Sequence, residues 1–333
     1  MNQSKTLLNP DVVIVGAGVA GIYMLHKLKN MGLTTVVLEK SDELGGTWNW
    51  NRYPGARCDI PSLEYSYQFD ENLQQDWNWS EKYSAQPEIL EYLNHVADRF
   101  ELRKDISFEE EVLEAQFNEE LSLWDIKTNK EVYQSKFCIF ATGCLSVPNK
   151  PDIEGLEGFE GQLLSTSYWP REEVDLSNKN VAIIGTGSSS IQTIPEIAKE
   201  VKNLYVFQRT PNYSIPSNNG PMDKEIEADI KSRYAEFRKE NWSNGFGIAG
   251  IADEALIAES DIDEVNNQLE ENWNNNGLGF FGGYADVPVD ANSNEIAASF
   301  VRNKIKEIVQ DPETADKLSP KYHIGGKRLC VDT

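Results

Sequence analysis

The sequence predicts an α/β protein with two Rossmann-like dinucleotide-binding domains, the second of which carries a helical insertion. Two glycine-rich loops favour this fold, DVVIVGAGVAGIYML near the N-terminus and NVAIIGTGSSSIQTI in the middle of the chain. Each loop follows an apolar strand, opens a helix and leads to a second strand that ends near a charged residue. This order is typical of nucleotide-binding βαβ units. We expect the first domain over residues 1–145 and the second over 146–333, with the insertion at about 222–300.

Composition excludes several classes of partner. The 333 residues suffice for two domains, each with its own core. Acidic residues number 54 against 31 basic ones, and the net charge of -23 repels nucleic acid and anionic lipid. The four cysteines form no CxxC pair and histidines are few, so we expect no metal centre. Without a bilayer-spanning apolar run or a signal-peptide pattern, a cytoplasmic protein of undetermined oligomeric state is expected.

The first glycine loop has the GxGxxG pattern. Residues 11–15 form a mostly β-branched apolar run and predict a buried parallel strand. Gly16 permits the tight turn after this strand, Gly18 lets the backbone approach a pyrophosphate, and Gly21 lets helix and strand pack closely. A helix over 19–30 would point its N-terminal amides at that pyrophosphate.

The charged residues that close the two units have opposite signs. The strand expected at 35–38 ends on Glu39, and a carboxylate at this place accepts a hydrogen bond from the 2′-hydroxyl of a plain ribose. Arg209 occupies the matching place in the second unit, where a guanidinium accommodates a ribose that carries an extra phosphate. The chain is therefore expected to hold two different dinucleotides.

Glycine pairs and aromatic residues crowd the stretch GGTWNWNRYPGARCDIPSLEYSYQF, residues 45–69. On residue types alone, this stretch is either a loop that wraps a flat ring or a surface loop pinned by tryptophans. Its GGTW and NRYPGARCD segments resemble the flavin-binding stretch of the Baeyer–Villiger monooxygenases, a subgroup of the flavin-dependent monooxygenases. The resemblance implies that FAD lies beside Gly46, Thr47 and Trp48. It also implies that Asp59 lies in the active site beside the flavin.

The segment between the two glycine loops predicts one helix and several strands. Apolar residues recur at helical spacing over 88–102, which indicates a core-facing helix with a structural or solvent-exposed His95. Alternation over 106–117 and 123–132 predicts a small antiparallel meander. KFCIFATG, residues 136–143, predicts a buried strand, and its ATG turn resembles the hinge between the two nucleotide domains of the family.

FEGQLLSTSYWP, residues 159–170, resembles the fingerprint of the same family, a phenylalanine, a glycine, a histidine and a tryptophan-proline pair at fixed spacing. Ser165 stands where the family has its histidine, which is thought to help couple domain movement to catalysis. A serine can donate one hydrogen bond but carries no charge near neutral pH. The resemblance therefore implies a less efficient version of this coupling.

The second glycine loop follows a strand expected at 181–184 and has a serine at its third position. Ser190 adds a side chain where helix meets strand, which loosens the packing without blocking it. Pro195 is expected near the start of the following helix and can kink it. The candidate contacts to the second dinucleotide are Gly185, Thr186, Gly187, Ser188 and Ser189.

The segment after the next strand, expected at 204–207, indicates which nicotinamide cofactor is bound. Arg209 can pair with a phosphate through two hydrogen bonds, and Thr210 offers a hydroxyl. These residues favour NADPH over NADH, with an exposed arginine at a strand end as the alternative. The segment FQRTPNY also resembles the phosphate-selecting segment of the family.

The last third of the chain contains the expected insertion and a basic pair. Residues 222–300 are acidic, rich in asparagine and mostly helical in pattern, and NGLGFFGGY at 276–284 either lines a substrate entrance or packs as a loop. Further on, IGGKRLCVDT resembles the segment in which the family has a lysine and a catalytic arginine. The resemblance implies that Arg328 is catalytic and that Lys327 contacts the NADPH phosphate. On residue types alone, the pair is surface charge.

The resemblance covers nearly the whole chain and implies a flavin-dependent oxidoreductase. Such a Baeyer–Villiger-type monooxygenase uses FAD, NADPH and O2 to insert one oxygen atom next to the carbonyl of a small ketone, giving an ester or lactone. The cofactor carries the chemistry, Arg328 stabilises the developing negative charge, and Asp59 orients Arg328. A monooxygenase of nitrogen or sulfur and a shortened nucleotide-binding relative with little activity are the alternatives. Family members are longer, so a fragment or a shortened relative is expected.

Overall fold

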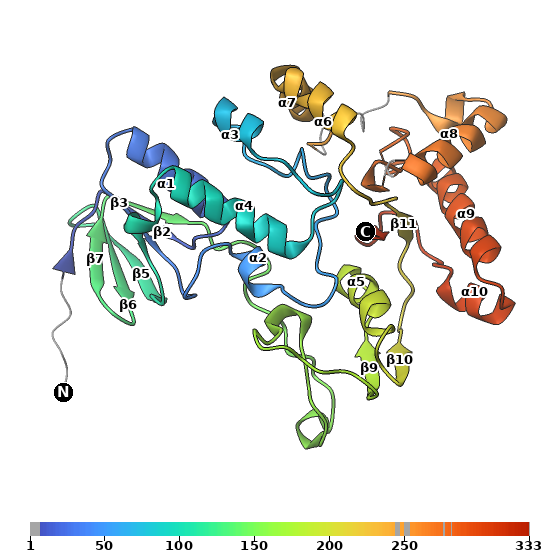
Figure 1. Cartoon of the computed structure of the whole chain (residues 1–333), viewed down its shortest axis with the longest axis horizontal. Helices are drawn as coiled ribbons and strands as arrows, with labels where there is room; N and C mark the ends of the chain where they lie inside the picture. The colour runs from blue at the N-terminus through green and yellow to red at the C-terminus, as the bar shows by residue number, and fades with distance from the viewer. Residues whose placement is uncertain (1–6, 244–246, 250–253, 276, 281, 333) are drawn as a thin grey trace. The chain divides into compact units, whose positions relative to one another are not determined.

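The computed structural model describes residues 7–243, 247–249, 254–275, 277–280 and 282–332. The chain forms two compact units (Figure 1). The first comprises Met1–Arg52 and Gln86–Arg171, and the second comprises Tyr53–Ala85 and Glu172–Thr333. This division differs from the boundary expected at residue 145, because residues 53–85 pack with the second unit and residues 146–171 with the first.

A four-stranded parallel sheet forms the centre of the first unit. Its order is β4-β3-β2-β8, with β2 at Val12–Val15, β3 at Thr35–Leu38, β4 at Ile106–Ser107 and β8 at Phe137–Phe140. The apolar run of β2 is buried because this strand has a neighbour on each side and helix α1, Val19–Asn30, packs against it. Both α1 and β3 have the bounds that the sequence predicts.

A second sheet of the first unit has the order β1-β7-β6-β5. These strands are Leu7–Leu8, Val132–Ser135, Leu123–Thr128 and Val112–Asn118. Strands β5, β6 and β7 are antiparallel, as the alternation predicts, whereas β1 runs parallel to β7. The prediction was wrong for Ile106, which lies in β4 and pairs with the parallel sheet. Ile126 and Tyr133 pack against Val13 and Leu38, which forms a core between the two sheets.

Two helices and three short turns complete the first unit. Helix α2 spans Thr47–Trp50, and α4 spans Gln86–Arg99, close to the expected 88–102. The apolar side of α4 is buried, and α4 packs against α2. The 3-10 turns lie at Arg103–Asp105, Leu156–Gly158 and Thr166–Tyr168.

The second unit holds the second glycine loop between two parallel strands. Strand β9, Asn180–Ile184, pairs with β10, Asn203–Phe207, and α5, Ser188–Ile197, connects them. Pro195 lies near the end of α5, not near its start as predicted, because α5 begins directly at the glycine loop and has only ten residues. A second parallel pair, β11 at Ser214–Pro216 and β12 at Cys330–Asp332, brings the end of the described chain against α5.

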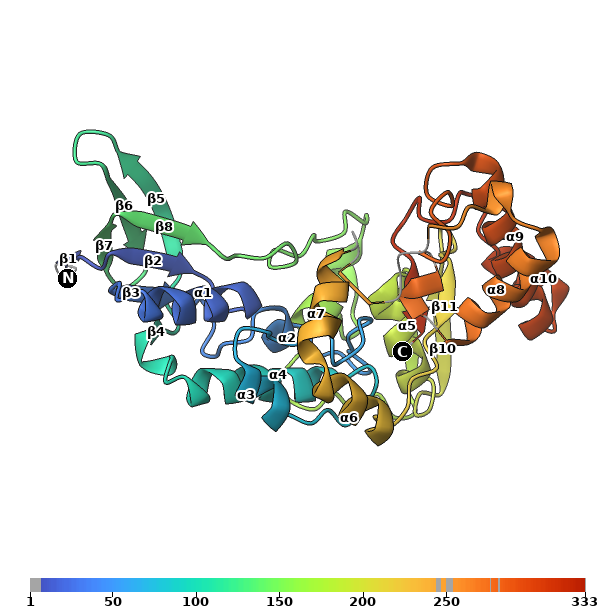
Figure 2. The same ribbon diagram turned by 90° about the horizontal axis from the view of Figure 1, so that it is seen from above.

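The rest of the second unit is mainly helical (Figure 2). Its helices are α3 at Glu71–Asp76, α6 at Lys224–Ser232, α7 at Tyr234–Ser243, α8 at Ile262–Asn275, α9 at Ala291–Ile308 and α10 at Pro312–Leu318. Asp223, Asp290 and Asp311 accept backbone amide hydrogen bonds at the starts of α6, α9 and α10, as capping carboxylates do. Buried apolar residues of α8 and α9 form one core with β11. Helical structure thus continues past the expected limit near residue 300.

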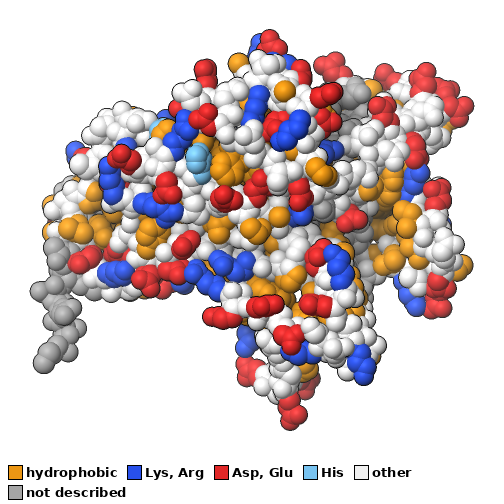
Figure 3. All heavy atoms as spheres, in the orientation of Figure 1, with side chains coloured by type: hydrophobic (Ala, Val, Ile, Leu, Met, Phe, Trp, Pro, Cys, Tyr) orange, Lys and Arg blue, Asp and Glu red, His pale blue; other side chains and the backbone are white. Residues whose placement is uncertain are grey.

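Apolar side chains reach the surface in several places, among interspersed acidic and basic groups (Figure 3). In the second unit they include Ile184 and Phe207, at the ends of β9 and β10. In the first unit they include Phe137 and Phe140 of β8. Among the described helices, none combines the length and apolar character required to cross a bilayer. The described residues also contain no group of three or more potential metal ligands.

Candidate functional site

The first glycine loop has the shape that close binding of a nucleotide backbone requires. Gly16 has a positive φ of 101° and stands at the end of β2, and α1 begins immediately after Gly18. A Cβ on Gly21 would overlap the carbonyl oxygen of Gly16, so this position has no room for a side chain. The first turn of α1 contains no acidic residue, and such a helix N-terminus is suited to an anion.

Replacing Gly21 by alanine is therefore expected to abolish retention of a dinucleotide at this loop, because the added methyl group would push α1 away from β2. The flavin-to-protein ratio of the purified variant, read from its absorbance, measures this effect. Gly32→Ala is the matched control, because a Cβ there meets no atom within 4 Å, although its φ of 78° costs some stability. Equal flavin content in Gly21→Ala and in the unaltered protein would contradict the assignment.

Glu39 is buried at the end of β3 and is oriented by two backbone amides. Its Oε2 accepts a hydrogen bond of 2.7 Å from the Ala17 amide, and its Oε1 accepts one of 2.8 Å from the Ser41 amide. Only 6% of Glu39 is exposed, and it lies against the glycine loop. Each carboxylate oxygen can accept more than one hydrogen bond, so Glu39 remains able to bind a ribose hydroxyl.

The GGTW stretch packs directly on the first glycine loop. The Gly45 amide donates a hydrogen bond of 2.9 Å to the Ala17 carbonyl, and Gly46 lies against Gly18. Thr47 begins α2 with its side chain exposed, whereas Trp48 is buried. The structure thus brings the two predicted parts of the first site together. Trp48 is only 8% exposed, which fits both a loop that wraps a ring and a loop pinned by tryptophans.

The fingerprint segment belongs to the first unit. Ser165 begins the 3-10 turn Thr166–Tyr168, and its hydroxyl accepts a hydrogen bond of 3.3 Å from the Ser167 amide. Ser165 therefore has a local capping role. Arg171, just after this segment, forms an ion pair with Asp42 of the same unit.

The second glycine loop is held by polar contacts from neighbouring segments. The Thr186 carbonyl accepts a hydrogen bond of 2.6 Å from the side chain of Asn212. Gly185 has a positive φ of 107°, and α5 begins after Gly187. The Ser188 hydroxyl lies 3.7 Å from the sulfur of Cys330 in β12. This loop and helix start form a second anion-binding geometry, which includes Ser189 in the first turn of α5.

The predicted phosphate-selecting residues follow β10. Arg209 is exposed, and its side chain makes no ion pair or hydrogen bond within the described residues. Lys327 is also exposed, and its Nζ lies 5.3 Å from the ring centroid of Tyr322. The Tyr322 hydroxyl donates a hydrogen bond of 3.2 Å to Asn212, two residues after Thr210. These contacts link the Lys327 segment to the loop that carries Arg209 and Thr210.

Asp59 and Arg328 form an ion pair, although 269 positions separate them in the sequence. The Arg328 Nη2 donates a hydrogen bond to Asp59 Oδ2, and this hydrogen bond raises the pKa of Arg328. The Asp59 side chain is 15% exposed, whereas 66% of the Arg328 side chain is exposed. The guanidinium is therefore permanently charged, oriented by the carboxylate, and still open to a further acceptor.

Two buried thiols flank this ion pair along the chain. Cys58 precedes Asp59, and burial raises its pKa to about 12. Cys330 lies two residues after Arg328, and burial raises its pKa as well. Both sulfurs are therefore protonated at neutral pH and behave as small packing groups rather than nucleophiles.

A cavity of about 210 Å³ in the second unit reaches Asp59. Charged residues on its wall include Glu64 and Lys82, and the stretch 276–284 contributes Leu278 and Gly279. Phe280 and Tyr284 of the same stretch pack in the hydrophobic core, so its described part both lines a cavity and packs as a loop. Positions 276 and 281 lie outside the described residues. Burial raises the pKa of Glu64 to about 7 and lowers the pKa of Lys82.

Glu64 is expected to make the stability of the second unit depend on pH. Its pKa rises from 4.5 to about 7 on folding, so the folded protein holds this proton more tightly than the unfolded chain does between those values. Stability therefore falls as the pH rises through this range. Glu64→Gln should raise the free energy of unfolding by up to about 3 kcal/mol at pH 8 and change it little at pH 4.5. Denaturant titrations at both pH values, with Glu259→Gln at an exposed site as control, would show no such difference if Glu64 titrates normally.

Comparison with protein-family models identifies the family. The model of the pyridine nucleotide-disulphide oxidoreductases matches residues 13–315, which include both glycine loops. The chain belongs to this family.

Comparisons with individual proteins confirm the resemblance to the Baeyer–Villiger monooxygenases. The chain is 40% identical over 327 residues to a Baeyer–Villiger monooxygenase of Pseudooceanicola batsensis, covering 96% of this chain and 59% of that protein. It is 35% identical to cyclohexanone 1,2-monooxygenase of an Acinetobacter species, covering 96% of this chain and 60% of that protein. A phenazine N-monooxygenase of Lysobacter antibioticus is 36% identical, covering 97% of this chain and 60% of that protein.

Solved structures agree with this fold. A structure of oxidized steroid monooxygenase bound to NADP matches with a TM-score of 0.94 and 44% identity, covering 98% of this chain and 62% of that one. A complex of OTEMO with FAD and NADP matches with a TM-score of 0.93 and 37% identity, with 99% and 63% covered. The chain thus spans about three fifths of the length of these relatives.

Several residues that organise this family member's site were not predicted from its sequence. Asn212 and Tyr322 connect the glycine loop to the Lys327 segment, and Tyr53 and Gln192 connect the Asp59 loop to α5. Asn212 lies within FQRTPNY, so its place next to the predicted phosphate residues was a usable signal. Tyr53 and Gln192 also lie inside segments that the sequence singled out, but no local pattern shows that they pair.

Proposed function

We propose that the protein containing this chain is an FAD- and NADPH-dependent monooxygenase that inserts one oxygen atom of O2 next to a ketone carbonyl. The product is an ester or lactone. The observation that carries this proposal is the Asp59–Arg328 ion pair in the same unit as the second glycine loop. A cytoplasmic location and a small-molecule ketone as partner belong to the same proposal.

The first site fits FAD. The cradle at Gly21 and Gly16 admits no side chain, and the amides at the start of α1 suit a pyrophosphate. Glu39, which lies against the glycine loop, would accept a hydrogen bond from the adenosine ribose, and the GGTW stretch would form the adjoining wall. A bound flavin would supply the redox chemistry and the activation of O2.

The second site fits NADPH. Gly185, Thr186 and Gly187 would face the pyrophosphate, with Ser188 and Ser189 at the start of α5. Arg209 and Thr210 would bind the 2′-phosphate, and Lys327 would add a second positive charge. The exposed, unpaired guanidinium of Arg209 supports this role, because no carboxylate among the described residues competes for it.

Arg328 would stabilise negative charge on oxygen when the ketone carbonyl is attacked. Its guanidinium carries fixed donors, and Asp59 occupies one side of it while leaving the rest exposed. Asp59 would thereby fix the direction of the remaining donors. Preorganised donors of this kind act in the transition state without a cost of reorientation.

The decisive experiment tests the purified full-length protein with NADPH and with two kinds of substrate, a cyclic ketone and a thioether. A yellow protein whose absorbance bleaches with NADPH without air, and which converts a cyclic ketone to a lactone in air, would support the proposal. A colourless protein would instead favour a nucleotide-binding relative with little activity.

Oxygenation of nitrogen or sulfur is the second candidate, and the similarity to a phenazine N-monooxygenase favours it. Ketone oxygenation requires an anionic oxygen donor, whereas oxygenation of a heteroatom requires a protonated one. Turnover of a thioether or an aromatic amine, with none of the ketone and an optimum at lower pH, would replace the first candidate by the second.

A further inference from the structure

The loop that carries Asp59 lies on the helix of the second glycine loop. The Tyr53 hydroxyl donates a hydrogen bond of 2.8 Å to the side-chain oxygen of Gln192, in the middle of α5. The side-chain nitrogen of Gln192 donates a hydrogen bond of 3.0 Å to the Arg57 carbonyl. One amide side chain therefore holds the loop at two points, four residues apart.

The backbone of this loop also touches α5 directly. Gly55 has a positive φ of 78°, and a Cβ there would overlap the carbonyl oxygen of Gln192. Only glycine permits this approach. Tyr53 is buried against this helix, with only 9% of its surface exposed. The loop is thus fitted against α5 from Tyr53 to Arg57.

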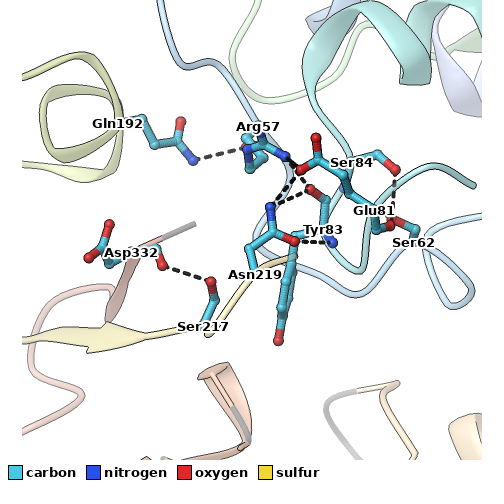
Figure 4. A network of polar contacts seen from close by, with 9 residues as sticks. All are labelled: Arg57, Ser62, Glu81, Tyr83, Ser84, Gln192, Ser217, Asn219 and Asp332. Carbon is cyan, nitrogen blue, oxygen red and sulfur yellow. Dashed lines mark hydrogen bonds and ion pairs between the residues drawn. The ribbon is translucent and has the colours of Figure 1, made fainter. Parts of the chain in front are cut away.

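The opposite side of the loop is anchored by a separate polar network (Figure 4). The Arg57 guanidinium forms an ion pair with Glu81 and donates a hydrogen bond of 2.6 Å to the Tyr83 carbonyl. Asn219 donates to Glu81 at 2.8 Å and accepts from the Tyr83 amide at 2.9 Å. Arg57 is therefore held at two places: its guanidinium contacts Glu81 and Tyr83, and its backbone carbonyl accepts a hydrogen bond from Gln192.

The second partner of the ion pair is also tied to α5. Arg328 lies two residues before Cys330, whose sulfur meets the Ser188 hydroxyl at the start of α5. Strand β12, which begins at Cys330, packs against this helix. Helix α5 therefore contacts both of the segments that carry Asp59 and Arg328, and its N-terminus is the second nucleotide loop.

We propose that Gln192 is a positioning residue. It fixes the position of Asp59 relative to the second glycine loop and, through the ion pair, the position of Arg328. This inference rests on the proposed function for its catalytic meaning. The glutamine amide suits the role because one end donates and the other accepts. An apolar side chain would leave the Arg57 carbonyl and the Tyr53 hydroxyl without these partners, and a partly buried polar group that loses its partner is destabilised. The loop would then open more often and the ion pair would lose its fixed place.

The test uses the full-length protein with Gln192→Leu, Tyr53→Phe and the double variant. Gln75→Leu is the matched control, because Gln75 also donates its amide to a backbone carbonyl, that of Lys231, at an exposed place away from the loop. Hydrogen exchange of the Cys58 amide, which donates to the Ser84 carbonyl, reports loop opening without any turnover. We expect exchange about tenfold faster in Gln192→Leu and unchanged in Gln75→Leu.

Two kinetic readouts separate positioning from a general loss of structure. Reduction of the flavin by NADPH should stay within about twofold of the unaltered rate, whereas the fraction of consumed NADPH that yields oxygenated product should fall about tenfold. Gln192→Glu keeps the acceptor for Tyr53 and loses the donor to Arg57, so an intermediate fraction is expected. The double variant should be no worse than Gln192→Leu, because the Tyr53 hydroxyl acts through Gln192.

Unchanged exchange of the Cys58 amide in Gln192→Leu would overturn the inference, whatever reaction the protein catalyses. Faster exchange with an unchanged product fraction would overturn it as well, because the loop would then move without consequence. A protein that oxygenates no ketone would refute only the proposed function, since the exchange measurement does not depend on it.

Discussion

Replacing Arg328 by alanine is expected to lower the rate of oxygen transfer to a ketone by about 10²-fold or more, while the flavin is still reduced by NADPH. The guanidinium is the group that Asp59 orients, and most of its side chain is exposed to an incoming ligand. Removing it takes away a preorganised donor in the transition state and leaves Asp59 without its ion pair. Single-turnover measurement of flavin reduction, followed by quantification of the lactone, separates the two steps.

Two further variants sharpen this expectation. Arg328→Lys keeps the charge but loses the planar set of donors, and should recover only part of the rate. Arg233→Ala removes an arginine of the same unit that pairs with Asp229 at 2.9 Å, and should leave both steps unchanged. Lactone formation by Arg328→Ala at the unaltered rate would remove Arg328 from the mechanism.

Replacing Arg209 by alanine is expected to lower kcat/KM for NADPH by roughly 10-fold to 100-fold, the effect of losing charge-assisted hydrogen bonds to a phosphate. The value for NADH should change by less than about twofold, because a plain ribose offers this side chain no phosphate. Arg209 is exposed and its guanidinium is not engaged by the described residues, so the variant is expected to fold normally. Steady-state rates with both coenzymes measure the ratio.

Lys327→Ala should lower kcat/KM for NADPH further when it is combined with Arg209→Ala, since both cations would face the same phosphate. Lys199→Ala is the control, because this exposed lysine pairs with Glu196 on the same unit. A preference for NADPH that survives loss of Arg209 and Lys327 would assign the phosphate to other residues.

The elements around the two glycine loops could be predicted from the sequence because their signals are local. Apolar β-branched runs, glycine turns and helical spacing placed α1 and β3 at their observed bounds. Pro195 was misplaced because the residues around it do not show that α5 ends at Ile197. Ile106 was misassigned because alternation does not tell which of two sheets a short strand will join.

The site was predictable in its parts but not in its assembly. Glycine patterns and the signs of Glu39 and Arg209 are readable from residue types alone. The nearness of Asp59 and Arg328 rested on the resemblance, since no spacing rule joins residues 269 positions apart. The pair Tyr53 and Gln192, 139 positions apart, had no sequence signal that shows their contact.

The burial of Cys58 and Cys330 has a consequence for the durability of such an enzyme. Thiols are oxidised by hydrogen peroxide chiefly as thiolates, and a sulfur that stays protonated and dry is attacked slowly. If the proposed oxygenase releases hydrogen peroxide during turnover, Cys58 and Cys330 would be oxidised slowly to sulfinic and sulfonic acids. The segments that carry Asp59 and Arg328 would thereby be protected. Inactivation during prolonged turnover should then begin at the exposed Cys144 or at methionines, and a mild reductant should do little to preserve the working site.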